Sequence, residues 1–86
     1  MKQTTEKDQL HRLAELMQSE RDNLFRYVCY RLGSAAEAED VIQDLYERLS
    51  KQGSRLAEID DLQGYVYRSL SNSCASRLRS RHQFMP

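Results

Sequence analysis

One stretch constrains this chain more than any other, residues 34–49, with the sequence SAAEAEDVIQDLYERL. Apolar side chains recur on one side at about 100° per residue, the helical spacing, and are Ala38, Val41, Ile42, Leu45 and Leu49. Ser34 precedes the first turn and Glu37 follows three residues later, which is the pattern of a capping box. We therefore predict one capped amphipathic helix that buries this apolar side in a core.

The opposite side of this helix is polar and carries Glu37, Asp40, Gln43, Asp44 and Glu47. Five acidic residues lie between positions 37 and 47, with no Lys or Arg among them. Solvated helices usually mix charges, because opposite charges one turn apart stabilise a helix and like charges cost a little. The single sign predicts a basic partner surface, and an ordinary solvated face is the alternative.

The 86 residues suffice for one small domain, and 40% hydrophobic with 30% charged residues indicates a globular chain. We expect no membrane insertion, because no apolar run is long enough to span a bilayer. No signal peptide follows Met1, so we expect a cytoplasmic protein. Cys29 and Cys74 fall among apolar neighbours and are expected to be buried, reduced thiols.

The net charge is zero, but the charges are unevenly distributed. Residues 63–86 contain no acidic residue and four basic ones, which are Arg68, Arg77, Arg79 and Arg81. The other 62 residues hold nine basic and thirteen acidic residues and therefore carry a net charge of −4. An acidic middle and a basic end indicate two partners, or one partner with two faces.

The hydrophobic spacing predicts an all-α fold with helical segments at about residues 5–32, 35–52 and 61–81. The first is expected to break near Ser19, because Ser-Glu-Arg-Asp has the composition of an N-terminal cap. Gly33 and Gly53 are placed to end the first and second segments. In a single domain of residues 1–86, these segments would form a compact bundle of three to four helices.

The third segment follows residues 54–60, which read as a loop, and Asp60 or Asp61 is placed to cap it. Its apolar side chains recur every fourth residue and are Leu62, Val66, Leu70, Cys74 and Leu78. Residues 81–86 carry no cap and read as the start of a linker.

The inventory of reactive groups argues against an enzyme. His11 and His82 lie near opposite ends of the chain, and we expect neither to have an acidic or cysteine neighbour at metal-ligand spacing. The sequence has no Gly-rich phosphate loop and no Gly-x-Ser-x-Gly motif. A water-exposed stripe of carboxylates also lacks the shielded pair that acid–base catalysis needs. We expect no catalytic residue, no metal and no cofactor.

The third segment has the features of a nucleic-acid contact. Arg68, Asn72 and Arg79 fall within about 40° of one another, opposite the apolar stripe, with Ser76 close by. Arg and Asn side chains contact phosphates and base edges, and Tyr65 and Tyr67 could stack unpaired bases. Cationic residues that complement the helix dipole, and tyrosines at the rim of the core, are the alternatives.

Together these segments resemble the second conserved region of bacterial sigma factors, in the small extracytoplasmic-function group. Three pieces carry the resemblance: LFRYVCYRLG at residues 24–33, AEDVIQDLY at 38–46, and GYVYRSLSN at 64–72, continuing to Arg81. The sequence departs from the family pattern in the last of these three pieces. Tyr65 stands where many relatives have Trp, and Ser71 and Ser76 replace positions that often hold Arg and Asp.

The resemblance implies a transcription-initiation subunit. Its middle helix would dock on core RNA polymerase, at the clamp coiled coil of the largest subunit, through Asp40, Gln43 and Asp44, with Glu47 on the same face. The loop at about residues 51–61 would capture a flipped base of the promoter −10 element. The residues expected to contact promoter DNA are Tyr65, Arg68, Asn72, Arg79 and Arg81.

The resemblance also implies features outside these contacts. An anti-sigma factor is a possible further partner. Full-length members continue through a linker to a helix-turn-helix domain, and we expect residues 1–86 to be one domain of such a longer protein, without the helix-turn-helix domain. A helical adaptor module without DNA binding is the alternative function. A plain helical domain is a third interpretation, which intramolecular bonds at Asp40 and Gln43 would favour.

Overall fold

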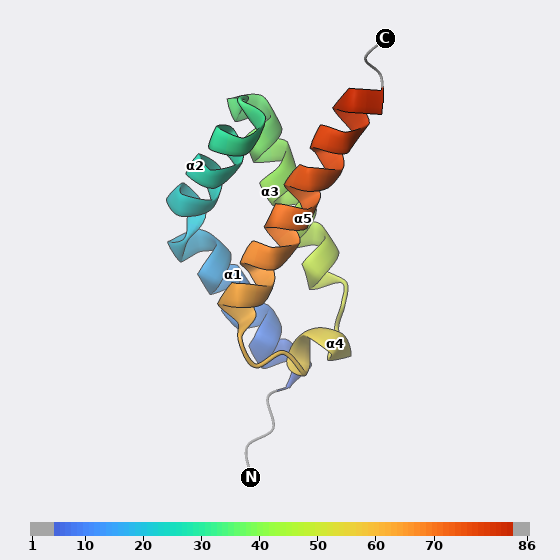
Figure 1. The fold of residues 1–86 in the computed structure, drawn as a ribbon. Coiled ribbons are helices and arrows are strands. Elements are labelled where there is room, and N and C mark those ends of the chain that lie inside the picture. Colours follow the sequence, from blue (N-terminus) through green and yellow to red (C-terminus); the bar gives the residue numbers. More distant parts are fainter. Residues whose placement is uncertain (1–4, 84–86) are drawn as a thin grey trace.

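The computed structural model describes residues 5–83, with side chains as far as Arg81, and its regular elements in this range are five α-helices (Figure 1). They are α1 (Glu6–Ser19), α2 (Arg21–Leu32), α3 (Ala35–Ser50), α4 (Ser54–Ala57) and α5 (Leu62–Gln83). The all-α class is confirmed. Four of these helices are long, and the remaining one, α4, is a single turn. None of the described helices is long and apolar enough to cross a membrane.

The first predicted segment is divided in two at Glu20, close to the expected break. Thr5 caps α1 by accepting a hydrogen bond from the Asp8 amide, at 3.0 Å. The expected cap at Ser19 is wrong, because the Ser19 hydroxyl donates back to the Leu16 carbonyl. Glu20 instead precedes α2 and makes no side-chain capping bond. The resulting elbow turns α1 and α2 so that both bury their apolar sides.

The turn between α2 and α3 follows the local sequence signals. Gly33 has φ 72°, a left-handed conformation that glycine adopts without strain, and its amide donates to the Cys29 carbonyl. The Ser34 hydroxyl accepts from the Glu37 amide at 3.1 Å, which confirms the cap of α3. The expected capping box is otherwise incomplete, because the Glu37 carboxylate pairs with Arg77 and Arg81.

Residues 54–60 are not simply a loop, since residues 54–57 form the single turn α4. Leu56 is fully buried, and the Gln9 side-chain amide donates to the carbonyls of Leu56 and Ile59 at 2.9 and 3.1 Å. Gln9 is 2% exposed and is the buried polar residue of the described range. Asp61 caps α5 by accepting from the Gly64 amide at 3.0 Å, which resolves the choice between Asp60 and Asp61.

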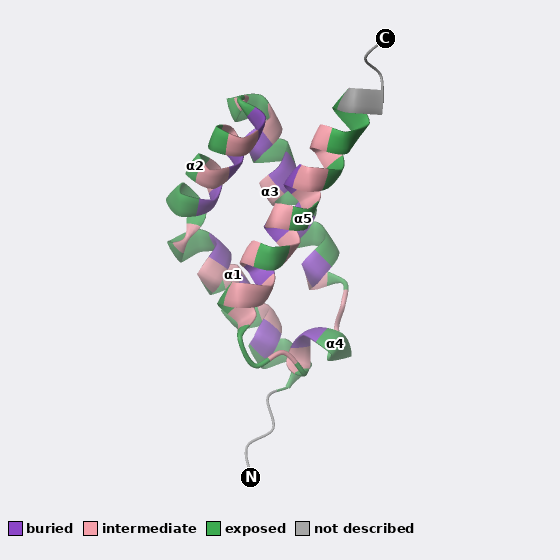
Figure 2. Ribbon diagram, in the orientation of Figure 1, coloured by how far each residue is buried: buried purple, intermediate pink, exposed green. Residues whose placement is uncertain are grey.

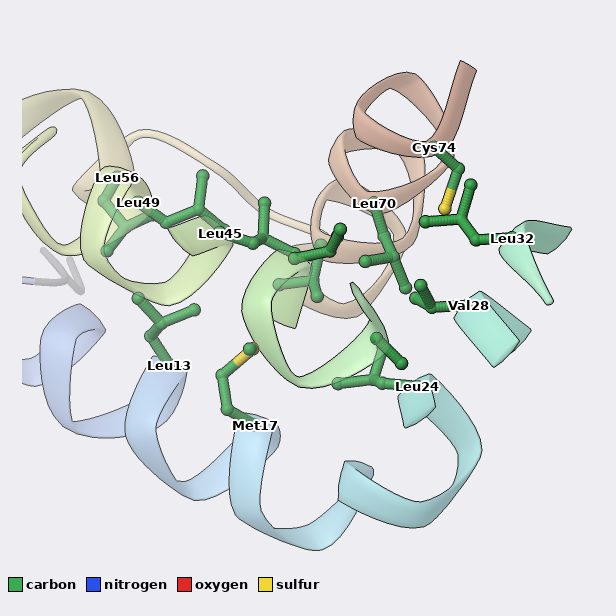
Figure 3. Packing of buried hydrophobic residues seen from close by; sticks show 13 residues of the cluster. Leu13, Met17, Leu24, Val28, Leu32, Leu45, Leu49, Leu56, Leu70 and Cys74 are labelled. Carbon is green, nitrogen blue, oxygen red and sulfur yellow. The ribbon is translucent and has the colours of Figure 1, made fainter. Parts of the chain in front are cut away.

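The core lies around α3, and every helix contributes to it (Figure 2). Buried side chains from α1, α2, α3, α4 and α5 point toward one another, and those labelled in Figure 3 are Leu13, Met17, Leu24, Val28, Leu32, Leu45, Leu49, Leu56, Leu70 and Cys74. The predicted α5 stripe is buried at its centre and half-buried at Leu62 and Leu78. Both cysteines are free, but Cys29 is only half-buried. Burial raises the pKa of the Cys74 thiol, against the opposite effect of Arg31 and Arg77.

Candidate functional site

The polar side of α3 forms an exposed acidic face, by which we mean Asp40, Gln43, Asp44 and Glu47. All four residues are exposed, while Val41 and Leu45 between them are buried. The side chain of Asp40 is 75% exposed. The periodicity therefore places these four side chains together on the surface, as predicted from the sequence.

Arginines of the same chain meet part of this acidic face. Asp40 lies 3.3 Å from Arg77 of α5, and Asp44 lies 3.7 Å from Arg48, one turn further along α3. Within residues 5–81, neither Gln43 nor Glu47 makes a side-chain hydrogen bond or ion pair. Exposed ion pairs contribute about 0–1 kcal/mol, so these contacts leave the face available to a partner. The interpretation as a plain helical domain would require intramolecular bonds at both Asp40 and Gln43, and only Asp40 makes one.

Glu37 does not belong to the exposed face, contrary to the sequence prediction. Its side chain is only 33% exposed, and its carboxylate pairs with Arg81 and lies 3.9 Å from Arg77. Arg81 also donates to the Leu32 carbonyl at 3.1 Å, at the end of α2. Glu37 and Arg81 thus fasten α5 to the turn between α2 and α3.

The outward side of α5 carries the predicted cationic stripe, defined as Arg68, Asn72 and Arg79. All three residues are exposed, and Ser76 lies exposed beside them. One helix presents them at helical spacing on the side opposite Val66 and Leu70, which are fully buried. Two arginines and an amide on one face can contact phosphates and base edges together.

Two other predicted DNA contacts, Tyr65 and Arg81, already have partners in the fold. The half-buried Tyr65 donates its hydroxyl to the Gln52 side-chain oxygen at 2.8 Å, which ties α5 to the segment before α4. Arg81 makes the contacts with Glu37 and Leu32 described above. These two residues are therefore less free to meet a ligand than the cationic stripe.

Tyr67 also has an intramolecular partner, since its hydroxyl donates to Glu20 at 2.8 Å. Burial raises the pKa of Tyr67 to about 12, with further contributions from the hydrogen bond to Glu20 and from its charge. The ring packs at the edge of the core, as the alternative reading of the sequence expected.

The acidic face and the cationic stripe lie on neighbouring helices, because α3 packs against α5. A shallow hollow of about 250 Å³ separates them, lined by Asp44, Arg48, Asn72, Ser73, Ser76 and Arg77. Arg48 donates to the Ser73 hydroxyl across this hollow at 2.8 Å. The two predicted binding surfaces thus border each other rather than occupying opposite sides of the molecule.

A second hollow, which the sequence did not reveal, lies where the α1–α2 elbow meets α3. It has a volume of about 490 Å³, and its lining mixes apolar with polar and charged side chains, which are Ala14, Met17, Gln18, Arg21, Phe25, Glu39, Ile42, Gln43 and Tyr46. The one available signal was Ile42, which extends the apolar side of α3 beyond a narrow stripe. Gln43 makes this hollow continuous with the acidic face.

The described residues hold no group of three or more His, Cys, Asp or Glu side chains placed to bind a metal ion. Contrary to the expectation that His11 has no acidic neighbour at such spacing, Glu15 follows it by one turn and lies 3.5 Å from it at the exposed surface. The expectation that a linker starts at residue 81 is wrong for residues 81–83, which are the last residues of α5, while residues 84–86 and the side chain of His82 lie outside the described range.

An acidic face lies beside a cationic stripe on helices that share one small core, an arrangement typical of a domain that binds other macromolecules. The sequence model of the Sigma-70 region 2 family matches residues 16–84, and the chain belongs to this family. Sigma-70 region 2 binds core RNA polymerase and recognises the −10 promoter element in transcription initiation, and it is not an enzyme. No curated protein matches the chain at the significance required, and neither does a solved structure.

Proposed function

We propose that the acidic face of α3 is the surface that docks on core RNA polymerase, at the clamp coiled coil of its largest subunit. The observation that carries this proposal is the availability of the face: Gln43 and Glu47 have no intramolecular partner in the described range, and Asp40 is 75% exposed. A basic partner can replace Arg77 at Asp40 with little loss, because exposed pairs are weak. The three-piece resemblance supports assigning the chain to the extracytoplasmic-function group.

We propose further that the cationic stripe holds promoter DNA, with Tyr65 and Arg81 at its two ends. Residues 51–61 would capture the flipped base. The support for this assignment is the burial of Leu56 and the two hydrogen bonds from Gln9, which hold this segment against α1, together with the hydrogen bond from Tyr65 to Gln52, which ties it to the start of α5. Unstacking a base costs a few kcal/mol, which a preorganised segment and phosphate contacts can offset.

Polymerase docking would take place in the cytoplasm, where we place the protein. An anti-sigma factor would be expected to cover the acidic face, since masking Asp40 and Gln43 would block docking. Competition between such a protein and core polymerase would be the direct consequence.

Binding to purified core RNA polymerase tests the docking proposal. Asp40→Arg should weaken binding by about tenfold or more, because loss of one partner from a charge pair at an interface costs several kcal/mol. Glu15→Arg is the matched control, as it makes the same charge change at an exposed position of α1. Circular dichroism should show equal helix content in both variants.

The docking assignment is wrong if the two charge reversals act equally, or if Asp40→Arg has no effect. The adaptor alternative, which needs no DNA contact, would gain support if docking required Asp40 while the cationic stripe proved dispensable for promoter opening.

A further inference from the structure

Gln9 occupies a core position of α1 where the helical spacing calls for an apolar side chain. It shares the buried side of this helix with Leu13 and Met17, which follow at intervals of four residues. Gln9 is 2% exposed, and burying an amide costs free energy unless its polar atoms find hydrogen-bond partners. A leucine at this position would avoid that cost, so packing alone does not account for the amide.

The partners of this amide lie in the turn around α4. The side-chain nitrogen of Gln9 donates to the carbonyls of Leu56 and Ile59, at 2.9 and 3.1 Å. The Ile59 amide also donates to the Leu56 carbonyl at 3.2 Å, which closes the backbone at this point. The last carbonyls of a helix have no partner within the helix. Gln9 therefore caps the end of α4 from a different helix.

A second close approach joins α1 to the beginning of the same turn. Figure 1 shows the first turns of α1 beside α4, and the two helices are in contact. Gly53 immediately precedes α4 and has φ 51°, and a Cβ at this position would lie 3.0 Å from a carboxylate oxygen of Glu6. The start of α1 thus meets the turn at its beginning through Glu6 and at its end through Gln9.

The turn around α4 has a buried side and an exposed side. Leu56 is fully buried, whereas the polar residues Ser54, Arg55 and Glu58 are exposed. Hydroxyl, guanidinium and carboxylate groups can donate to and accept from the edges of bases. The orientation of the turn, which Gln9 fixes at its end, therefore decides which polar groups face a captured base.

The turn has little else to hold it in one arrangement. Leu56 is the one fully buried side chain between residues 51 and 61. A segment with few buried apolar contacts opens locally at a low cost in free energy. Two hydrogen bonds from a buried amide restrict the turn to one arrangement, and such preorganisation reduces the entropy that is lost when a ligand binds.

We propose that Gln9 is a positioning residue for base capture, whose two hydrogen bonds hold residues 53–59 in the arrangement that selects a base of the −10 element. Gln9 acts through the backbone of the turn and does not touch DNA. The proposal rests on the proposed function, because it requires residues 51–61 to capture the flipped base. Gln9 precedes residues 16–84, which match the Sigma-70 region 2 family, so the family match carries no information on this contact.

The test measures the base preference of the complex between the chain and core RNA polymerase. The probe is a pool of single-stranded DNA with a randomised centre, from which the bound strands are sequenced. The wild type should enrich one base at the captured position. Gln9→Ala should lower this enrichment by about 5-fold or more, since a lost base contact changes affinity by at least that factor. Binding to core polymerase should stay unchanged, because Gln9 is buried and does not belong to the acidic face.

Two further variants separate the hydrogen bonds from packing and from stability. Gln9→Met keeps the length of the side chain but has no donor, so it should lose the enrichment as Gln9→Ala does. Val28→Ala removes buried volume from α2, outside the turn, and should lower stability while keeping the base preference. Enrichment retained in Gln9→Met, or lost equally in Val28→Ala, would overturn the role of the amide.

The wild type itself distinguishes this inference from the proposed function. A wild-type complex that enriches no base would overturn the capture of a flipped base, and the role of Gln9 with it. A wild-type complex that selects a base, beside a Gln9→Ala complex that selects it equally well, would overturn the role of Gln9 alone.

Discussion

The Asp40 carboxylate lies 3.3 Å from the Arg77 guanidinium, and this pair joins the acidic face of α3 to the helix that carries the cationic stripe. The same arginine lies 3.9 Å from Glu37, which also pairs with Arg81. Arg77, on the helix proposed for DNA binding, therefore competes with core polymerase for the carboxylate of Asp40. A partner that binds Asp40 breaks its ion pair with Arg77.

Removal of this competitor should strengthen docking slightly. Arg77→Ala should raise the affinity for core polymerase by at most about 5-fold at low salt, because an exposed ion pair contributes no more than about 1 kcal/mol. The gain should shrink at high salt, where exposed charges are screened. Arg79→Ala is the control, since it removes an equal charge from α5 without touching Asp40. Equal gains in polymerase affinity from both variants would show that the effect comes from the change in net charge and not from the loss of the Arg77–Asp40 pair.

The cationic stripe should matter for DNA and not for docking. Arg68→Ala combined with Arg79→Ala should spare binding to core polymerase and weaken promoter opening, because two phosphate contacts are lost. Opening is measured by permanganate reactivity of unpaired thymines in a reconstituted polymerase complex. The assignment of this stripe fails if the doubly substituted protein opens the promoter as the wild type does.

Gln9 should be needed for the placement of residues 51–61. Gln9→Ala removes the side-chain donor to the carbonyls of Leu56, which still accepts from the Ile59 amide, and of Ile59, and should cost about 1–3 kcal/mol of unfolding free energy. Gln9→Glu should cost more, because a buried carboxylate would face two carbonyl oxygens. Urea unfolding measures both values, and Gln18→Ala, at an exposed position of α1, is the control.

Tyr67 should make stability fall at alkaline pH. Its folded pKa of about 12 exceeds the ordinary value of 10.0, so its contribution is complete below pH 10 and is lost as the pH rises through about 12. The difference in unfolding free energy between wild type and Tyr67→Phe should therefore decrease over this range. Parallel curves for the two proteins would show that burial and Glu20 do not perturb this hydroxyl.

Local features of the fold were predictable from the sequence because their causes lie within a few residues. Helical spacing identified the buried side chains of α3, and short-range hydrogen bonds made Ser34 and Gly33 recognisable as helix ends, whereas the cap of α5 was narrowed only to Asp60 or Asp61. The acidic face and the cationic stripe follow from the same spacing, since each lies on one helix. The break near Ser19 was anticipated, but the expected cap at Ser19 was wrong, and Glu20 makes no side-chain capping bond to α2.

Contacts between distant residues could not be predicted in this way. Gln9 reads as one more polar residue of a surface helix, yet it bonds residues 47 and 50 positions away. The sequence predicts Glu37 to be half of a capping box, but in the structure its carboxylate pairs with Arg77 and Arg81 of α5. The exposure of Tyr30 follows from which side of α2 the bundle covers. The sequence by itself determined the helices and the chemistry of each face, because both depend on spacing along one helix. Only the tertiary structure decided which charges pair and which remain free, because that depends on how the helices pack.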